Sequence, residues 1–405
     1  MLDPESDPRQ YIDFTSGGIF AAGLGPESEI IHKAIKRVRN FCSYAPKFGN
    51  YWRERYIEAV KEFTGFESVA LFSTGAEACE AFWRCCRVYT NRPGIWGGLV
   101  DPDEVGKEKT RSDAMHGMTL GALIMAGRMN WPDLGYFPEL GAHRFGGNPG
   151  NTGGMIIEPY HAPSGQFHKI DPTIKRIQEL RRVHTEIPLC IDEVQGGFGR
   201  TGKLWAHQHY VDKLAQPEEP YLKPDFVTIG KLAGGGLPLS ALLGPKEIME
   251  SQSVKEFGHL HSTHSGNPLM CSVGLAVIDE IRDEGLIREA RIKGEMMHDW
   301  LAKLAVRVHG KGLMAGIEFK NREECKRAVE RIESRGVLVV DTGRKWIKLG
   351  PALNIEPTTL GLGLKIIEET VEEIVHERDV APCGDSGQGQ EAAGPDAPVL
   401  SETGV

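Results

Sequence analysis

Apolar positions recur along the chain in short runs that predict strands separated by helices. The clearest runs are MIIE at 155–158, PLCID at 188–192 and FVTIG at 226–230, each followed by a polar or glycine-bearing turn. Between the first two runs, residues 170–186 carry apolar side chains at helical spacing, and Asp171 is placed to cap that helix. This β-α-β unit predicts an α/β fold.

A different pattern follows in the C-terminal quarter, where short apolar runs flank one predicted helix. GLMAGIEF at 312–319, VLVV at 337–340 and IKLG at 347–350 predict strands, and residues 323–336 predict a helix. With 405 residues, the chain also exceeds the size at which single hydrophobic cores usually stop growing. We therefore expect a second, smaller α+β domain. Residues 381–405 are rich in Gly, Pro, Ala and acidic side chains, which predicts a disordered tail.

Composition narrows the class of protein. A hydrophobic content of 40% and a charged content of 25% are ordinary for a globular protein, and the net charge of -9 argues against nucleic acid as a partner. No apolar stretch is long enough to span a bilayer, and the N-terminus MLDPESDPRQ lacks the features of a signal peptide. We expect a cytoplasmic protein without a membrane partner. Its eight scattered cysteines form no CxxC pair and are expected to be reduced thiols.

A lysine stands at the end of a predicted strand in the stretch FVTIGKLAGGGLPLSALLG, residues 226–244. Gly230 allows the backbone to turn sharply after the apolar run, which places Lys231 at the strand's carboxyl end. Ligands collect at that edge of open parallel sheets. Lys231 is therefore either a surface residue with a buried stem or an amine directed into a site.

An acidic residue ends another strand in the same way. In LCIDEVQGGFG, residues 189–199, an apolar run delivers Asp192 to a glycine-rich turn. One interpretation is an ordinary loop carboxylate. The other is a carboxylate that pairs with a cation from a cofactor, such as a protonated ring nitrogen.

A third signal lies in LFSTGAEACEAFWR, residues 71–84, which joins a short strand to a helix. Thr74 and Glu77 have the spacing of a capping box. The start of such a helix can hold a phosphate, although it is also a common helix start. Pyridoxal 5'-phosphate would explain all three signals, because it carries a phosphate, a ring nitrogen and an aldehyde that a lysine can attack.

With these motifs together, the chain resembles the class III pyridoxal-phosphate aminotransferases of fold type I, which include ornithine, acetylornithine and 4-aminobutyrate aminotransferases. The resemblance runs from about residue 11 to residue 372. It is carried by STGAEACEA, DAMHGMTLGALIMAG, IIEP, IDEVQGGFGRTGKLWAHQHY, PDFVTIGKLAGGGLPLSALLG, STHSGNPL and GLMAGIEF. It implies a large domain with a mostly parallel sheet between helices, and a smaller α+β domain. The implied divisions are an N-terminal segment packing with the small domain (1–45), a large cofactor-binding domain (46–272), the small domain (273–380) and the tail (381–405).

The resemblance also implies roles for individual residues. Lys231 would form a Schiff base with pyridoxal 5'-phosphate and move a proton between Cα and C4'. Asp192 would pair with the pyridinium, and Gln195 would hydrogen-bond near the phenolic oxygen. Thr263 would reach the phosphate of the neighbouring subunit, which implies a homodimer with active sites at its interface. The other residues assigned to the cofactor are Thr74, Gly75, Ala76, Met115, His116, Glu158 and Val194.

Several positions depart from the family pattern. Met115 stands where the family usually has an aromatic ring stacked on the cofactor, and a thioether replaces that contact only partly. Met118 stands where ornithine-type members keep an arginine for the substrate's carboxylate. Pro163 takes the place of the second glutamate of the EPxxGE pattern.

Lys348, in WIKLGPAL, replaces the arginine that grips the carboxylate of 2-oxoglutarate or glutamate. A lysine binds a carboxylate as a point charge and lacks the planar fork of arginine. A shift of the alignment by a few residues would bring Arg344 into this role instead. Ile19 is the remaining candidate for substrate contact. These departures argue against ornithine or acetylornithine as the donor and favour an amine, amino alcohol or unusual amino acid, with a 2-oxo acid or another carbonyl compound as the acceptor.

Two other functional classes stay open at this point. A decarboxylase, racemase or aminomutase would use the same Lys231 and Asp192, and a non-catalytic cofactor-binding protein is a third alternative. The histidines of HLHSTH, residues 259–264, fit no standard zinc spacing, so no metal is expected.

Overall fold

The computed structural model describes residues 10–41, 49–97, 114–127, 142–143, 149–163, 165–168, 174–212 and 219–380. Two sequence predictions lie outside these residues: the disordered tail at 381–405 and the cap at Asp171. No helix in the described part of the chain is long and apolar enough to cross a membrane.

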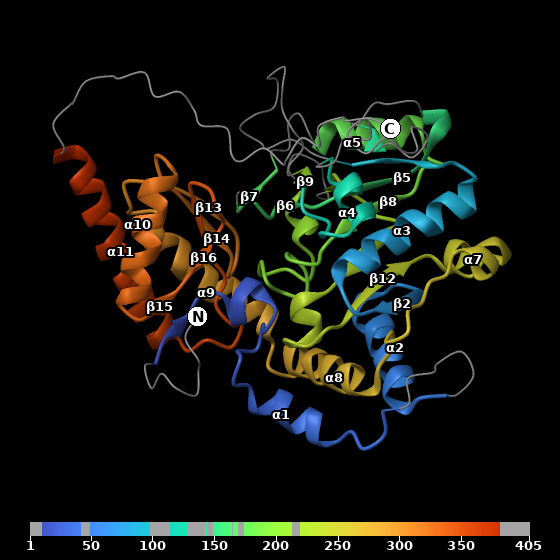
Figure 1. Cartoon of the computed structure of the whole chain (residues 1–405), viewed down its shortest axis with the longest axis horizontal. Helices are drawn as coiled ribbons and strands as arrows, with labels where there is room; N and C mark the ends of the chain where they lie inside the picture. The colour runs from blue at the N-terminus through green and yellow to red at the C-terminus, as the bar shows by residue number, and fades with distance from the viewer. Residues whose placement is uncertain are drawn as a thin grey trace, which may run out of the picture.

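A seven-stranded sheet forms the centre of the larger domain (Figure 1). Its strands, in spatial order, are β2 (Ser68–Phe72), β12 (Ser240–Gly244), β11 (Phe226–Ile229), β8 (Leu189–Asp192), β5 (Thr152–Ile157), β3 (Gly94–Trp96) and β4 (Ala142–His143). Strand β12 runs antiparallel to both of its neighbours, whereas the pairs from β11 to β4 are parallel. The predicted mostly parallel sheet is confirmed, and the three predicted strands correspond to β5, β8 and β11.

Both faces of this sheet are buried, which explains why its strands have continuous apolar runs in the sequence. On β5, Met155 and Ile157 join one hydrophobic cluster, whereas Ile156 between them joins a second cluster with α3. Successive side chains of a strand point to opposite faces, so an apolar residue is needed at every position. The helices of this domain are α1 (Glu29–Lys36), α2 (Tyr51–Thr64), α3 (Gly75–Thr90), α4 (Leu120–Met125), α5 (Lys175–Val183), α6 (Lys246–Met249), α7 (Gln252–Phe257) and α8 (Pro268–Asp283).

The C-terminal part forms the smaller α+β domain that the sequence predicts. Its antiparallel sheet has the order β13 (Arg307–Gly310), β14 (Ala315–Glu318), β17 (Trp346–Leu349) and β16 (Val340–Asp341). Its helices are α9 (Leu286–Leu301), α10 (Arg322–Ser334) and α11 (Pro357–Val380). The predicted boundary between residues 272 and 273 falls inside α8, so a continuous helix, and no linker, occupies that position.

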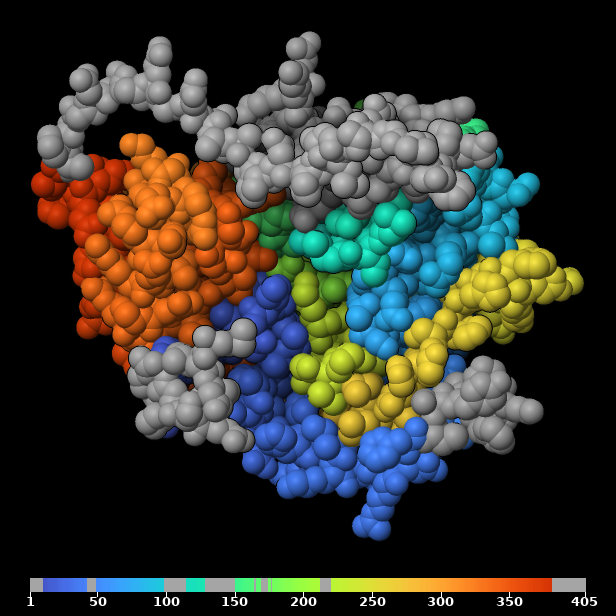
Figure 2. All heavy atoms as spheres, in the orientation of Figure 1, coloured from blue at the N-terminus to red at the C-terminus, as the bar shows by residue number. Residues whose placement is uncertain are grey.

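The N-terminal segment lies against the C-terminal domain. Strand β1 (Ile12–Asp13) pairs in parallel with β15 (Val337–Leu338), so the predicted VLVV strand divides its pairing between β1 and the small sheet. Figure 2 shows the blue N-terminal residues between the orange C-terminal part and the rest of the visible face. The remaining short elements are β6 (Tyr160–His161), β7 (Gln166–Phe167), β9 (Val211–Asp212), β10 (Glu219–Pro220), η1 (Ser16–Phe20), η3 (Pro149–Asn151), η5 (Ala206–His209) and η6 (Lys231–Gly234).

Candidate active site

The carboxyl ends of three adjacent parallel strands bring the chemically active side chains together. Strand β8 ends at Asp192, β5 is followed directly by Glu158, and β11 is followed by Gly230 and Lys231. The order β11-β8-β5 makes these ends neighbours, and the register places Asp192 opposite Thr228. Residues that are far apart in the sequence therefore meet at one edge of the sheet, where ligands of open α/β sheets bind.

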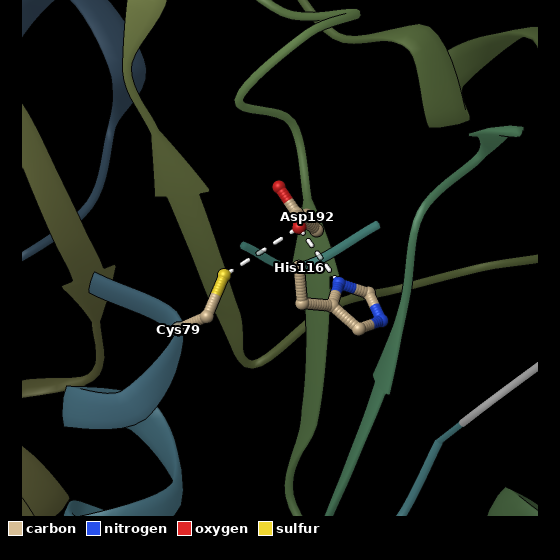
Figure 3. A group of neighbouring side chains, drawn as sticks. All are labelled: Cys79, His116 and Asp192. Atoms are coloured by element: carbon tan, nitrogen blue, oxygen red, sulfur yellow. Dashed lines mark hydrogen bonds and ion pairs between the residues drawn. The ribbon is translucent and has the colours of Figure 1, made fainter. Parts of the chain in front are cut away.

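Within the described residues, Asp192 accepts four hydrogen bonds, and Figure 3 shows those from Cys79 and His116. Its Oδ2 accepts from His116 Nδ1 at 2.7 Å and from the Cys79 thiol at 3.4 Å. Its Oδ1 accepts from the Val194 N–H at 3.1 Å and from Thr228 Oγ1 at 3.2 Å. Burial alone would raise the pKa of Asp192, but the His116 hydrogen bond and the Val194 N–H lower it more, so the net pKa lies below its usual value.

The grouping of Cys79, His116 and Asp192 also has the spacing of a metal site, since its ligand atoms lie within 4.8 Å of one another. The 2.7 Å between His116 Nδ1 and Asp192 Oδ2 is a hydrogen-bond length. Ligand atoms around zinc stand farther apart, because each lies about 2.0–2.3 Å from the metal at tetrahedral angles. We therefore interpret the group as a hydrogen-bonded support for Asp192. The His259 and His261 rings, 6.4 Å apart, belong to no such group among the described residues.

Lys231 lies half-buried beside this carboxylate in a strained conformation. Its φ of 49° is in the left-handed region, which side chains other than glycine rarely adopt. Its ammonium forms no hydrogen bond or ion pair with the part of the chain that the structure describes. Burial lowers the pKa of Lys231, and Asp192 and Glu158 oppose that shift. The amine of Lys231 is therefore not held by another described residue, and its lowered pKa favours the neutral form more than that of a surface lysine does. A nucleophilic amine must be neutral to react.

The start of α3 is the third part of the candidate site, beside Asp192 and Lys231. Thr74 is the N-cap: its hydroxyl accepts from the Glu77 N–H, and Glu77 Oε2 accepts from the Thr74 N–H at 2.9 Å. The predicted capping box is therefore confirmed. The first N–H groups of a helix have no intrahelical partner, so those of Gly75 and Ala76 point outward as donors for an anion.

Val194 fixes the distance between this helix start and the Lys231 turn. A Cβ added at Gly75 would lie 2.8 Å from Val194 Cγ1, and one added at Gly230 would lie 3.3 Å from the same atom. A larger residue at Gly75 would push Val194 out of place. The glycine therefore allows the helix start to approach the carboxyl end of β8.

We expect replacement of Thr74 by alanine to destabilise the cofactor-free protein by about 1 kcal/mol, the usual cost of losing an N-cap. Thermal or denaturant unfolding measures this loss. Thr74→Ser keeps the hydroxyl and should unfold like the parent. An unchanged midpoint in Thr74→Ala would contradict the importance of the cap.

Two side chains near Asp192 have buried polar atoms without a hydrogen-bond partner among the described residues. These atoms are the amide oxygen and amide nitrogen of Gln195, and Nε2 of His116, whose Nδ1 is bonded to Asp192. Buried polar atoms are nearly always satisfied, so these atoms indicate a polar ligand at this point. A ring with a phenolic oxygen, a ring nitrogen and a phosphate would fit Gln195, Asp192 and the start of α3 respectively.

Other predicted site residues lie apart from this cluster or at its edge. Met115 is half-buried, and its N–H donates to Glu158 Oε1 at 3.1 Å. Ile19 and Met118 are 56% and 70% exposed, so a single chain does not enclose them. Pro163 is half-buried, and Thr263 is exposed in the loop between α7 and α8.

Lys348 comes from β17 of the small sheet and is only 5% exposed. Its Nζ donates to the Ala162 carbonyl at 2.7 Å and lies 5.5 Å from the centroid of the Phe20 ring. Burial and the neighbouring Lys231 lower its pKa to about 7, opposed by Glu158. Arg344, the alternative to Lys348, follows β16, and its carbonyl accepts from Arg322.

The lowered pKa of Lys348 predicts that the stability of the protein depends on pH. The unfolded chain keeps Lys348 protonated up to its ordinary pKa of 10.5, whereas the folded protein loses that proton above about pH 7. Folding therefore releases a proton between these values, and the contribution of Lys348 to stability rises with pH by at most about 1.4 kcal/mol per unit. Comparing unfolding midpoints of the parent and Lys348→Met across this window should show a shallower rise in the variant. Equal slopes would contradict a neutral buried amine.

The sequence interpretation missed some supporting residues. Cys79 lies one turn after Gly75 on the same helical face, and Thr228 is the polar member of an apolar strand, so both carried a weak signal. Arg200, in the GRTG turn at residues 199–202, is fully buried. Its guanidinium donates to Ser16 Oγ at 3.2 Å and to the Pro351 carbonyl, so it serves the structure of the turn.

Comparison with known proteins identifies the family of the chain and proteins with a similar fold. A family model described as aminotransferase class-III matches residues 145–371. The acetylornithine aminotransferase of Aquifex aeolicus (strain VF5) is 28% identical over 382 residues, which cover 90% of this chain and 93% of that protein. The crystal structure of acetylornithine aminotransferase from Elizabethkingia anophelis superposes with a TM-score of 0.69 at 25% identity, covering 90% of each chain. The ornithine aminotransferase from Toxoplasma gondii, whose structure has partial occupancy of PLP at the active site, gives 0.74 at 22% identity, covering 91% and 87%.

Proposed function

The chain belongs to the class-III aminotransferases, and from that premise we propose that Lys231 and Asp192 are its catalytic residues. The protein is a transaminase of fold type I that uses pyridoxal 5'-phosphate. One observation carries the residue assignment. The Lys231 amine has no partner among the described residues, and it lies at a strand end beside a buried carboxylate that four donors hold in place.

Each side chain has a distinct task in this proposal. When bound, the cofactor supplies an aldehyde carbon for amine exchange and a protonated ring that accepts electron density. Asp192 keeps the proton on the ring nitrogen, because its own pKa is held low. Lys231 would accept at Nζ the proton that leaves the substrate's α-carbon and donate it to the former aldehyde carbon of the cofactor. The Gln195 amide NH2 would donate a hydrogen bond to the phenolic oxygen of the cofactor.

The start of α3 would hold the phosphate through the backbone N–H groups of Gly75 and Ala76, with Thr74 at the cap. Glu77 keeps the Thr74 hydroxyl occupied at 3.2 Å, so the backbone is the better donor. The residues proposed to line the cofactor are Thr74, Gly75, Ala76, Met115, His116, Glu158, Asp192, Val194, Gln195, Lys231 and Thr263.

The proposed amino donor is an amine, an amino alcohol or an unusual amino acid, and the acceptor is a 2-oxo acid or another carbonyl compound. Named relatives act on acetylornithine, but Met118 and Pro163 lack the charge that a second carboxylate or amine would need. Lys348 is the side chain proposed to bind an acceptor's carboxylate, whose negative charge would favour the protonated form of the lysine. Its Nζ donates to the Ala162 carbonyl, which a carboxylate would have to replace.

We expect N-acetylornithine to be a poor donor. Loss of a hydrogen bond to a charged group lowers kcat/KM about tenfold or more, and Met118 offers none. Steady-state rates over a donor panel measure the effect, and Met118→Arg should raise kcat/KM for N-acetylornithine without raising it for a neutral amine. A parent rate on N-acetylornithine equal to that on every other donor would refute the role of Met118.

We also propose a cytoplasmic homodimer in which Thr263 of one copy completes the phosphate site of the other. The exposure of Thr263, Met118 and Leu120 supports this assembly, since 70% and 54% exposure of the two apolar side chains is unfavourable in a free monomer. The six cysteines of the described residues are free and buried, which supports a reducing compartment. Sedimentation analysis of the purified protein tests the dimer.

Single-turnover spectroscopy tests the reaction itself. Adding an amino donor should convert the bound cofactor to its amine form, and adding a carbonyl acceptor should reverse the change. Release of carbon dioxide or loss of stereochemistry without amine transfer would instead indicate a decarboxylase or racemase. Borohydride reduction followed by peptide mass spectrometry should locate the adduct on Lys231.

A further inference from the structure

Glu158 holds two separate backbone segments, one with each carboxylate oxygen. Its Oε1 accepts from the Met115 N–H at 3.1 Å, and its Oε2 accepts from the Ala162 N–H at 3.3 Å. Glu158 itself is 4% exposed and directly follows β5. The first segment carries His116, which supports Asp192, and the second is the turn between β6 and β7. A single side chain therefore fixes the backbone on both sides of the strand end.

The Ala162 segment continues this chain of contacts into the smaller domain. The Ala162 carbonyl accepts from Lys348 Nζ at 2.7 Å, and Lys348 lies on β17 of the small sheet. A Cβ added at Gly165 would lie 3.2 Å from Lys348 Cγ, so the same turn also packs on the aliphatic stem of the lysine. The contacts thus run from Met115 through Glu158 and Ala162 to Lys348.

Glu158 also lies among charged side chains, which interact electrostatically with its carboxylate. His116, Asp192, Lys231 and Lys348 all lie close enough to shift its titration or to have theirs shifted by it. Burial raises the pKa of Glu158 to about 7, and His116 and the two backbone N–H groups act in the opposite direction. A carboxylate that serves only to satisfy two N–H groups would not need this charged surrounding.

We propose that Glu158 is a positioning residue that couples the cofactor side of the site to Lys348, by holding Met115 with one oxygen and the Ala162 turn with the other. This inference rests on the proposed function only in naming the Met115 side as the cofactor side. Both carboxylate oxygens of Glu158 accept backbone N–H groups, and this positioning task is additional to its proposed place in the lining of the cofactor site. Lys348 is thereby placed by a residue of the larger domain.

The test uses Glu158→Gln, which keeps the shape but turns an NH2 group toward one of the two N–H donors. Glu193→Gln is the matched control. Glu193 is likewise buried, and its two oxygens accept from the Ala206 N–H at 3.0 Å and the His207 N–H at 2.9 Å. It also pairs with His207 Nδ1 at 2.8 Å, and it takes no part in the contacts that run from Met115 to Lys348. Both variants lose a carboxylate that holds two backbone N–H groups, so they share the general cost of that loss.

The first measurement is trace acetylation of Lys348 in the cofactor-free protein, quantified by peptide mass spectrometry. At about pH 9 most of a lysine with a lowered pKa is neutral, so the rate there reports the accessibility of Lys348 and not its charge. We expect Glu158→Gln to raise this rate roughly threefold or more as the Ala162 turn loosens, and Glu193→Gln to leave it unchanged. An unchanged rate in folded Glu158→Gln, or an equal rise in both variants, would overturn the proposal.

The second measurement is cofactor affinity, from absorbance titration of the same proteins. Glu158→Gln should weaken binding of pyridoxal 5'-phosphate about tenfold through the Met115 segment. Glu158→Asp provides a second variant that keeps the charge but cannot span both segments, so it should also raise Lys348 labelling if Gln fails to fold. If no variant and no parent binds the cofactor, the proposed function fails while the labelling result still decides the coupling. If the parent binds the cofactor and labelling is unchanged, the coupling fails and the proposed function stands.

Discussion

Replacement of Lys231 by alanine is expected to abolish turnover while leaving the cofactor noncovalently held. The variant loses both the amine that forms the covalent link and the base that moves the substrate proton. General base catalysis alone contributes about 10²–10⁴-fold, so the combined loss should reach at least about 10⁴-fold. Steady-state kinetics at saturating cofactor measures the rate, and absorbance titration measures the remaining affinity.

A buried lysine elsewhere supplies the control for this variant. Lys293 is 9% exposed and donates to the Leu353 carbonyl at 3.1 Å, so Lys293→Ala also removes a buried ammonium. It should lower stability and leave kcat near that of the parent. If Lys231→Ala turned over substrate at more than about one hundredth of the parent rate, Lys231 would not be the catalytic lysine.

The second large effect is expected at Asp192. Asparagine keeps the shape but removes the charge, and its NH2 group would face donors such as His116 Nδ1 or the Val194 N–H. Without the carboxylate, the ring nitrogen loses its proton and the stabilisation of the α-carbanion falls. We expect kcat to fall about 10³-fold, the size of effect seen when a charge-stabilising group is removed, with a smaller change in cofactor affinity.

A cofactor analogue methylated on the ring nitrogen distinguishes two effects of Asp192→Asn: loss of the charge that keeps the ring protonated, and a change in the local structure of the site. Its permanent positive charge does not depend on Asp192, so it should recover part of the rate in Asp192→Asn. No recovery, with intact folding by circular dichroism, would indicate that Asp192 acts through geometry and not through its charge. Equal kcat in the parent and Asp192→Asn would exclude the catalytic role altogether.

Local patterns in the sequence were sufficient for several features. The capping box at Thr74 depends on residues three apart, and the buried strands depend on consecutive apolar residues, so both can be identified without distant contacts. The positions of Lys231 and Asp192 follow from the same patterns, because a strand end is a local property. The resemblance to a family then supplied the chemistry that these positions share.

Other features required contacts that no local pattern contains. Cys79 and Thr228 meet Asp192 from α3 and β11, and Lys348 reaches Ala162 from another domain. The predicted domain boundary fell within α8, because composition does not reveal where a helix continues between domains. Helix length and packing are decided by neighbours across the fold.

The sequence by itself determined the strands, the helix cap, the two chemically active strand ends and the family to which the chain belongs. Only the tertiary structure decided that Asp192 has four donors, that Lys231 has a strained backbone, and that Glu158 holds the Met115 and Ala162 segments. The physical reason is that periodicity and capping act over a few residues. Hydrogen bonds between strand ends depend instead on the order in which the sheet places its strands.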